Sequence, residues 1–116
     1  MSETQIYHNP RCSKSRETLA LLEQHGIAPD VVLYLEQAPS EDEIRTLLGQ
    51  LGFSDPRQLM RTKEDLYQEL RLSEVSGDAL ICAMHQHPKL IERPIVIMHG
   101  QARIGRPPEQ VLEIIK

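Results

Sequence analysis

A buried-strand pattern at residues 31–35 constrains the fold of this chain more than any other sequence feature. The run is rich in valine and leucine, which is typical of a strand buried on both faces and therefore of parallel pairing. Strand-like residues also occur at 4–8, and residues 14–25 have the pattern of a helix that ends at Gly26. The first 35 residues therefore predict a β-α-β unit.

The middle of the chain has the pattern of a block of short helices. Ser40 and Glu43 form a capping box, and apolar residues at helical spacing follow it. Further helix starts occur at Asp55 and around Gly77, and residues 40–88 contain almost no strand signal. We expect this block to be an insertion between the second and third strands.

Strand patterns return near the end of the chain. Residues 94–98 and 101–104 predict two antiparallel strands joined by a two-residue turn, and a last helix begins around Pro107. Without the helical block, the order of elements is β-α-β followed by β-β-α, the arrangement of thioredoxin-like proteins. We predict an α/β fold with a thioredoxin-like four-stranded mixed sheet. It forms a single domain over residues 1–116, with the helical insertion at about 40–88.

The composition is ordinary for a globular protein and limits the possible partners. The formal net charge is −4, which does not suggest a nucleic-acid-binding surface. No secretory signal opens the chain, and no apolar run approaches the roughly 20 residues of a membrane span. We therefore expect a cytoplasmic protein that binds neither nucleic acid nor membrane. Nine of the 13 cationic residues are arginine, a mild indication of an anionic substrate.

Cys12 is the residue at which we expect the chemistry of this chain. It lies in the turn between the first strand and the first helix, where backbone N–H groups and the helix dipole favour a thiolate. The neighbouring cations Arg11, Lys14 and Arg16 are expected to strengthen this effect. The same features bind oxyanions. His8 is a candidate partner of the thiolate.

The spacing around Cys12 excludes two familiar kinds of site. A dithiol redox motif needs a second cysteine where Ser15 stands, and a phosphatase-type Cys-x5-Arg loop needs arginine where Thr18 stands. Ser15 acts as a helix-start cap, as a hydroxyl donor to the sulfur, or as both. An anion must therefore be bound by arginines distant in the sequence. The candidates are Arg61, Arg93 and Arg106.

Several further residues carry more limited expectations. Arg93 precedes Pro94, at the place where thioredoxin-like folds have a cis-proline that faces the active-site loop. Cys82 lies on an amphipathic helix and is expected to pack in the core. His85 and His87 would point about 200° apart on that helix, so we expect no metal site.

Five segments of the chain form an ordered pattern. They are Ile6-Tyr7-His8-Asn9-Pro10-x-Cys12, Ser15-Arg16-x-Thr18-Leu19, Leu33-Tyr34-Leu35, Arg93-Pro94-Ile95-Val96 and Arg106-Pro107-x-Glu109. Together they resemble the glutaredoxin-dependent arsenate reductases over essentially the whole chain. The chain is most similar to the shorter members of that family, which lack a longer C-terminal tail.

This resemblance implies a function and a set of site residues. The function is reduction of arsenate to arsenite, with glutathione as a co-substrate, glutaredoxin as a partner and no bound cofactor. Cys12 corresponds to the nucleophile, His8 to a histidine that helps to ionise the thiol, and Ser15 to a hydroxyl near the sulfur. The arginines implied to surround the oxyanion are Arg61, Arg93 and Arg106.

Two other functions stay open. The Cys12-x-x-Ser15 spacing is also that of monothiol glutaredoxins, so a thiol oxidoreductase acting on another acceptor is one alternative. Spx-type redox regulators, which bind RNA polymerase, share the fold and the Arg-Pro-Ile signature. They typically carry a Cys-x-x-Cys switch, which Ser15 interrupts here. Arsenate reduction is therefore the leading hypothesis.

Overall fold

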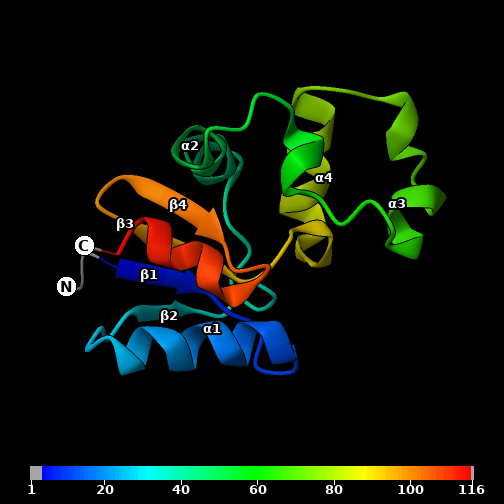
Figure 1. Ribbon diagram of the computed structural model, residues 1–116. Coiled ribbons are helices and arrows are strands. Elements are labelled where there is room, and N and C mark those ends of the chain that lie inside the picture. Colours follow the sequence, from blue (N-terminus) through cyan, green and yellow to red (C-terminus); the bar gives the residue numbers. More distant parts are fainter. Residues whose placement is uncertain (1–3, 116) are drawn as a thin grey trace. The chain divides into compact units, whose positions relative to one another are not determined.

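The computed structural model describes residues 4–115, which form two compact units. One unit contains residues 4–37 together with residues 93–115, and the other contains residues 38–92. All of the named strands belong to the first unit, whereas the second consists of helices and turns (Figure 1). No helix within residues 4–115 is long and apolar enough to cross a membrane.

The first unit is built on a four-stranded mixed sheet. Its strands are β1 (Thr4–Tyr7), β2 (Asp30–Val32), β3 (Ile95–Met98) and β4 (Gln101–Ile104). Their order in the sheet is β2-β1-β3-β4. β1 pairs in parallel with β2 and antiparallel with β3, and β3 pairs antiparallel with β4. This arrangement confirms the predicted sheet.

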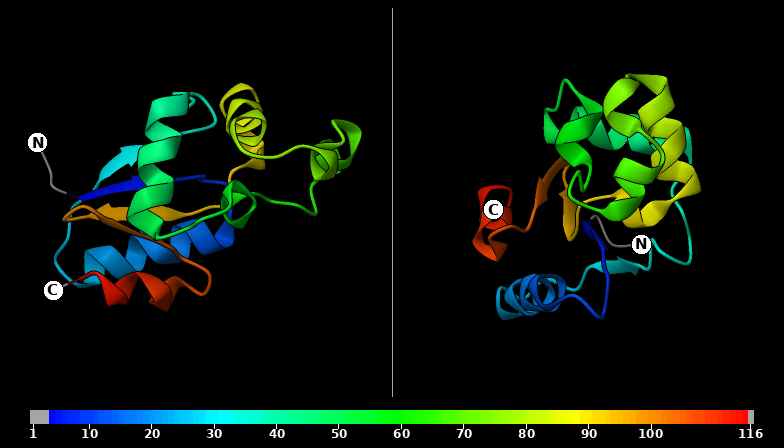
Figure 2. Two further views of the ribbon diagram at one scale, coloured as in Figure 1. Left: turned by 90° about the horizontal axis from the view of Figure 1, so that it is seen from above. Right: turned by 90° about the vertical axis from the view of Figure 1, so that its right-hand side faces the viewer.

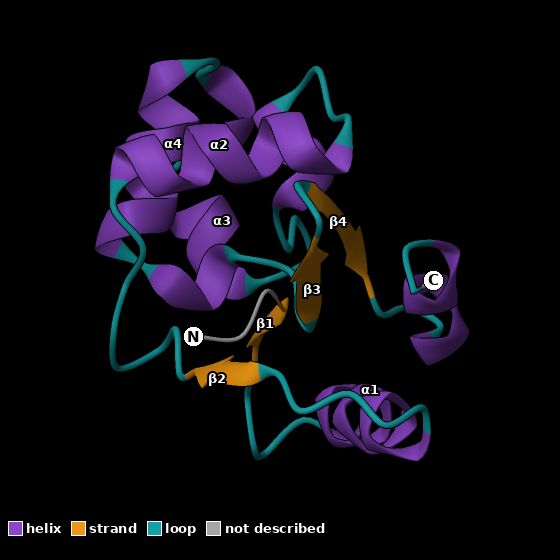
Figure 3. Cartoon of the chain, turned by 90° about the vertical axis from the view of Figure 1, so that its left-hand side faces the viewer, coloured by secondary structure: helices purple, strands orange, loops and turns teal. Residues whose placement is uncertain are grey.

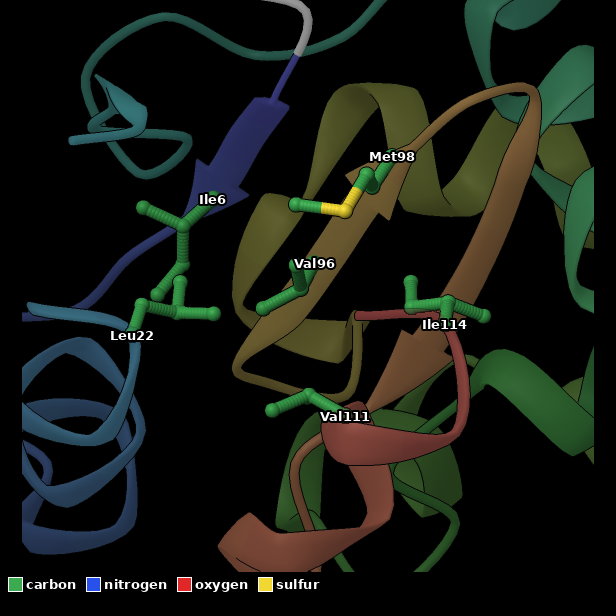
Figure 4. Packing of buried hydrophobic residues seen from close by; sticks show 6 residues of the cluster. All are labelled: Ile6, Leu22, Val96, Met98, Val111 and Ile114. Atoms are coloured by element: carbon green, nitrogen blue, oxygen red, sulfur yellow. The ribbon is translucent and has the colours of Figure 1, made fainter. Parts of the chain in front are cut away.

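One face of this sheet is covered by α1 (Ser13–Gln24) and the 3₁₀ helix η4 (Pro108–Glu113), which pack side by side (Figure 2). Apolar side chains from these helices, from β1 and β3, and from the residue that follows η4 form the core of the unit (Figure 4). Its buried members are Ile6, Leu22, Val96, Met98, Val111 and Ile114. Each such side chain stabilises the fold by about 1.5–3 kcal/mol when it is fully buried. The core therefore holds α1 in place against the strands.

β2 is shorter and more exposed than the sequence predicts. It ends at Val32, and the next residues turn back, with the N–H groups of Glu36 and Gln37 donating to the carbonyl of Leu33. The side chain of Val31 is 45% exposed. β2 pairs in parallel with β1, as predicted. The prediction of a strand over residues 31–35 that is buried on both faces is wrong. Among the strands of residues 4–115, β2 lies at an edge of the sheet and has β1 as its one neighbour.

The second unit contains the predicted block of short helices (Figure 3). Ser40 and Glu43 form the predicted capping box at α2 (Glu41–Leu51), each side chain accepting a hydrogen bond from the other's backbone N–H at 3.0–3.1 Å. α2 packs against α4 (Asp78–Gln86). The other helices are η1 (Pro56–Leu59), α3 (Asp65–Glu69), η2 (Leu72–Glu74) and η3 (Pro88–Leu90).

One residue of α4 departs from its predicted environment. Cys82 is partly exposed, although its neighbours Ile81 and Ala83 are buried. The prediction that it packs in the core is therefore wrong. Its place at the border of the apolar face of the helix explains the difference, because a border residue has core on one side and solvent on the other.

Candidate active site

Cys12 is the N-cap residue of α1 and closes a tight turn after β1. Its backbone N–H donates to the carbonyl of Asn9 at 3.0 Å, and its carbonyl accepts from the N–H of Arg16 at 3.0 Å. The N–H groups of Lys14 and Ser15 interact with the sulfur, although the side chain makes no cap of normal hydrogen-bond geometry. The sulfur therefore lies where the start of the helix favours negative charge.

Arg106, which is 94 positions from Cys12 in the sequence, contacts the Cys12 side chain. Its Nη2 atom lies 3.6 Å from Sγ of Cys12. Its Nε atom donates to the backbone carbonyl of Arg93 at 2.8 Å, which orients the guanidinium group. The Arg93–Pro94 peptide bond is cis, as expected from its position, and the Arg106–Pro107 bond is cis as well. Two of the three candidate arginines therefore lie in the same unit as Cys12.

The pKa of the Cys12 thiol lies below its ordinary value. Burial of the thiol is the largest single influence and raises the pKa. The backbone N–H of Ser15 and the positive charge of Arg93 act against it, followed by the N–H of Lys14 and the charge of Arg106. Together these groups outweigh the effect of burial and favour the thiolate.

The cations next to Cys12 in the sequence do not have the predicted role. The Arg16 Nη1 atom donates to the carbonyl of Pro10 at 2.8 Å, and Lys14 Nζ lies 3.7 Å from a carboxylate oxygen of Glu17. The charges that lower the thiol pKa are those of the distant arginines. The expected contribution of Lys14 and Arg16 to the thiolate is therefore not confirmed, because these two long side chains reach other partners.

His8 and Ser15, at the two ends of the turn that carries Cys12, form a buried polar pair. His8 Nδ1 and Ser15 Oγ are 2.7 Å apart, and Ser15 Oγ also accepts from the backbone N–H of Asn9 at 3.0 Å. The side chains are almost fully buried, with His8 7% and Ser15 0% exposed. The pKa of His8 is lowered by burial and, secondarily, by the charge of Arg16, so the neutral imidazole is favoured. The pair fixes the shape of the turn that carries Cys12.

Gly105 and Thr18 form a close contact that our sequence reasoning did not identify. A Cβ atom at Gly105 would lie 2.5 Å from Oγ1 of Thr18 and 3.0 Å from Cγ of Pro94. Thr18 is fully buried in α1, and Gly105 directly precedes Arg106. Glycine therefore permits the approach of β4 to α1 that positions Arg106. The sequence signal that could have indicated this close contact is an isolated glycine next to the end of a predicted strand.

Arg61 lies in the second unit and is held there by acidic neighbours. Its Nη1 atom lies 3.2 Å from a carboxylate oxygen of Glu64, and its Nε atom lies 3.9 Å from one of Glu92. Glu64 is also 3.5 Å from Nζ of Lys89. The role of Arg61 in binding an anion stays a prediction from the family resemblance.

The fold and the candidate site define a thioredoxin-like protein with a single cysteine in the loop between β1 and α1. Residues 7–114 match the ArsC family. YfgD of Escherichia coli K12, named as uncharacterised, is 61% identical over 97% of this chain and 97% of its own length. A protein named arsenate reductase from Haemophilus influenzae is 54% identical over 95% of this chain and 97% of its own.

A comparison with solved structures also finds a similar protein of known fold. A structure described as an arsenate reductase from Vibrio cholerae has a TM-score of 0.93 and 65% sequence identity, covering 96% of each chain. The thioredoxin-like fold is thereby confirmed. This chain belongs to the ArsC family.

Proposed function

We propose that this protein reduces arsenate to arsenite, with Cys12 as the nucleophile and with glutathione and glutaredoxin as the electron donors. The observation that carries the proposal is the thiol of Cys12 with the Arg106 guanidinium 3.6 Å away. A thiolate beside a fixed cation can attack the central atom of a tetrahedral oxyanion while the cation balances the charge on its oxygens. The relatives named as arsenate reductases support arsenate as that oxyanion.

In the first step the Cys12 thiolate attacks arsenic. A sulfur–arsenic bond forms, an arsenic–oxygen bond breaks, and the oxygen leaves as water after taking up protons. Arsenic remains pentavalent. Arg93 and Arg106 stabilise the negative charge of the remaining oxygens, and the lowered pKa of Cys12 keeps the attacking thiol ionised.

Two external thiols then supply the electrons. The sulfur of glutathione forms a second sulfur–arsenic bond, and another oxygen leaves as water. The thiolate of glutaredoxin next attacks the glutathione sulfur, so that a glutaredoxin–glutathione disulfide forms and the electron pair of the broken bond remains on arsenic. Water releases trivalent arsenite and regenerates Cys12. In sum, arsenate, one glutathione and one glutaredoxin thiol give arsenite, the mixed disulfide and water.

External thiols fit the architecture of the loop. The position three residues after Cys12 is Ser15, whose hydroxyl is bonded to His8 and to the N–H of Asn9. The loop thus holds no second thiol at the dithiol-motif position, which supports a resolving thiol supplied by another molecule. We place the reaction in the cytoplasm, where glutathione keeps thiols reduced.

A coupled assay tests this function. Purified protein is mixed with glutathione, glutaredoxin, glutathione reductase and NADPH, and NADPH oxidation is followed as arsenate is added. We expect arsenate-dependent oxidation that Cys12→Ser abolishes and that Cys82→Ser leaves unchanged. Arg61→Gln tests the third arginine and is expected to raise the KM for arsenate.

Two outcomes would contradict the proposal. The first is no turnover at high arsenate from folded protein whose Cys12 still reacts with a thiol reagent. The second is reduction of a glutathionylated substrate without arsenate and no response to arsenate, which would favour a thiol oxidoreductase acting on another acceptor.

A further inference from the structure

A pocket of about 560 Å³ adjoins the Cys12 loop within the first unit. Residues 8–11 line one side, and Leu33, Leu35 and Glu36 line the other. Its size falls within the range of about 300–1,000 Å³ that is typical of small-molecule sites. Apart from His8, none of these side chains has a part in the chemistry proposed above.

The walls of the pocket are two turns that leave the same edge of the sheet. β1 and β2 are parallel, so their carboxyl ends lie together, and the N–H of His8 extends the pairing by donating to the carbonyl of Val32 at 2.9 Å. In one turn the backbone N–H of Cys12 donates a hydrogen bond to the carbonyl of Asn9. In the other turn the backbone N–H of Glu36 donates to the carbonyl of Leu33 at 2.9 Å. Ligands of open α/β sheets commonly bind at the carboxyl ends of the strands.

The lining combines an apolar surface with one charge of each sign. Leu35 is 45% exposed, and Leu33 is partly exposed beside it. Arg11 and Glu36 are exposed and lie in the opposite turns. A ligand that complements this lining has a short apolar stem, a carboxylate for Arg11 and an ammonium group for Glu36.

We propose that this pocket binds the small peptidyl thiol that delivers the first external sulfur, with its carboxylate at Arg11 and its ammonium at Glu36. The proposal rests on the function proposed above, because that reaction needs such a thiol. Arg11 lines the pocket and directly precedes Cys12, so the pocket lies beside the loop that carries the proposed nucleophile. A zwitterionic peptide such as glutathione has the required charges, and the volume of the pocket favours a small molecule over a protein surface.

A binding experiment tests the pocket without relying on turnover. ¹⁵N-labelled wild-type protein is titrated with S-methylglutathione, which cannot react, and amide shifts are mapped. We expect the largest shifts at residues 8–12 and 33–36. Glu36→Lys should weaken binding about fivefold, whereas Glu23→Lys, the same charge change on the exposed surface of α1, should leave it unchanged.

A charge swap separates local contacts from net charge. Arg11→Glu combined with Glu36→Lys keeps the net charge of the protein but reverses both contacts, so binding of S-methylglutathione should again weaken. In the coupled assay the same variant should raise the KM for glutathione by a similar factor and leave the KM for arsenate unchanged.

Failure of this inference is distinguishable from failure of the proposed function. Shifts that map outside the two turns, or an unchanged KM for glutathione in the swap variant, would overturn the pocket assignment while arsenate turnover persists. Shifts in the two turns without arsenate turnover would support the pocket and contradict the proposed reaction. Shifts in the turns with glutaredoxin alone, and none with S-methylglutathione, would show a protein-docking surface and overturn the assignment.

Discussion

The Nη2 atom of Arg106 lies 3.6 Å from Sγ of Cys12, although the two residues are 94 positions apart in the sequence. The contact depends on the packing of the first unit. α1 presents Cys12 at its start, and β4 ends at Ile104 just before Gly105 and Arg106. The chemistry of the loop therefore depends on elements from both ends of the chain.

Removing the distant charge is expected to affect the thiol more than removing the adjacent one. Arg106→Gln should raise the pKa of Cys12, because the guanidinium stabilises the thiolate, so alkylation by iodoacetamide near neutral pH should become slower. Arg11→Gln is the matched control, since it removes one positive charge immediately beside Cys12. The pH profile of alkylation measures both. A larger change in Arg11→Gln than in Arg106→Gln would contradict our assignment of charges.

Ser15→Ala is expected to destabilise the protein through the loss of one buried and one partly buried hydrogen bond. His8 Nδ1 and the N–H of Asn9 would both lose their hydroxyl partner, and an unsatisfied buried polar group costs about 1–3 kcal/mol. Urea unfolding measures the change. Ser13→Ala is the control, because Ser13 is exposed on the first turn of the same helix and should change stability by less than about 0.5 kcal/mol. Equal effects of the two substitutions would be inconsistent with the buried pair.

The lowered pKa of His8 predicts a pH-dependent contribution to stability. The unfolded chain binds a proton to this residue more readily than the folded protein does, so folding is favoured when the imidazole is neutral. This contribution is complete above the unfolded pKa of about 6.5 and is lost as the pH falls through the folded pKa. Unfolding free energies of the wild type and His8→Gln should therefore diverge in pH dependence below neutrality. Parallel curves of unfolding free energy against pH for the two proteins would contradict a lowered pKa of His8 in the folded state.

A double-mutant cycle tests the close approach of β4 to α1. Gly105→Ala should cost about 1–3 kcal/mol, because the added methyl group meets Oγ1 of the buried Thr18. Thr18→Ala removes that obstacle, so the double variant should be more stable than the sum of the single changes predicts, by at least about 0.5 kcal/mol. Additive changes in urea unfolding would show that the contact with Thr18 does not impose the glycine.

Local features of the fold were predictable from the sequence, and position within the sheet was not. The capping box of Ser40 and Glu43 depends on residues three positions apart, so the spacing alone identifies it. The exposure of Val31 depends instead on β2 lying at the edge of the sheet. No pattern within residues 31–35 contains that information, because the same apolar run suits a central strand.

The candidate site likewise has features that local sequence predicts and features that depend on the folded chain. The place of Cys12 at a strand-to-helix turn follows from local sequence, whereas the partners of the nearby cations depend on where long side chains reach. Lys14 and Arg16 have nearer partners in Glu17 and the carbonyl of Pro10. Arg93 and Arg106 were candidates from position and family resemblance, but only the folded chain shows that Arg106 contacts the sulfur.

The most direct test of the central claim is protection of Cys12 by arsenate. The rate of Cys12 alkylation by iodoacetamide is measured at constant pH with increasing arsenate, in the wild type, Arg106→Gln and Arg11→Gln. We predict that arsenate slows alkylation of the wild type and of Arg11→Gln alike. Arg106→Gln should need about tenfold more arsenate, since a charge-assisted hydrogen bond contributes about 1.5–3 kcal/mol. An alkylation rate that arsenate does not change in the wild type, or equal protection of all three proteins, would contradict an oxyanion site made by Cys12 and Arg106.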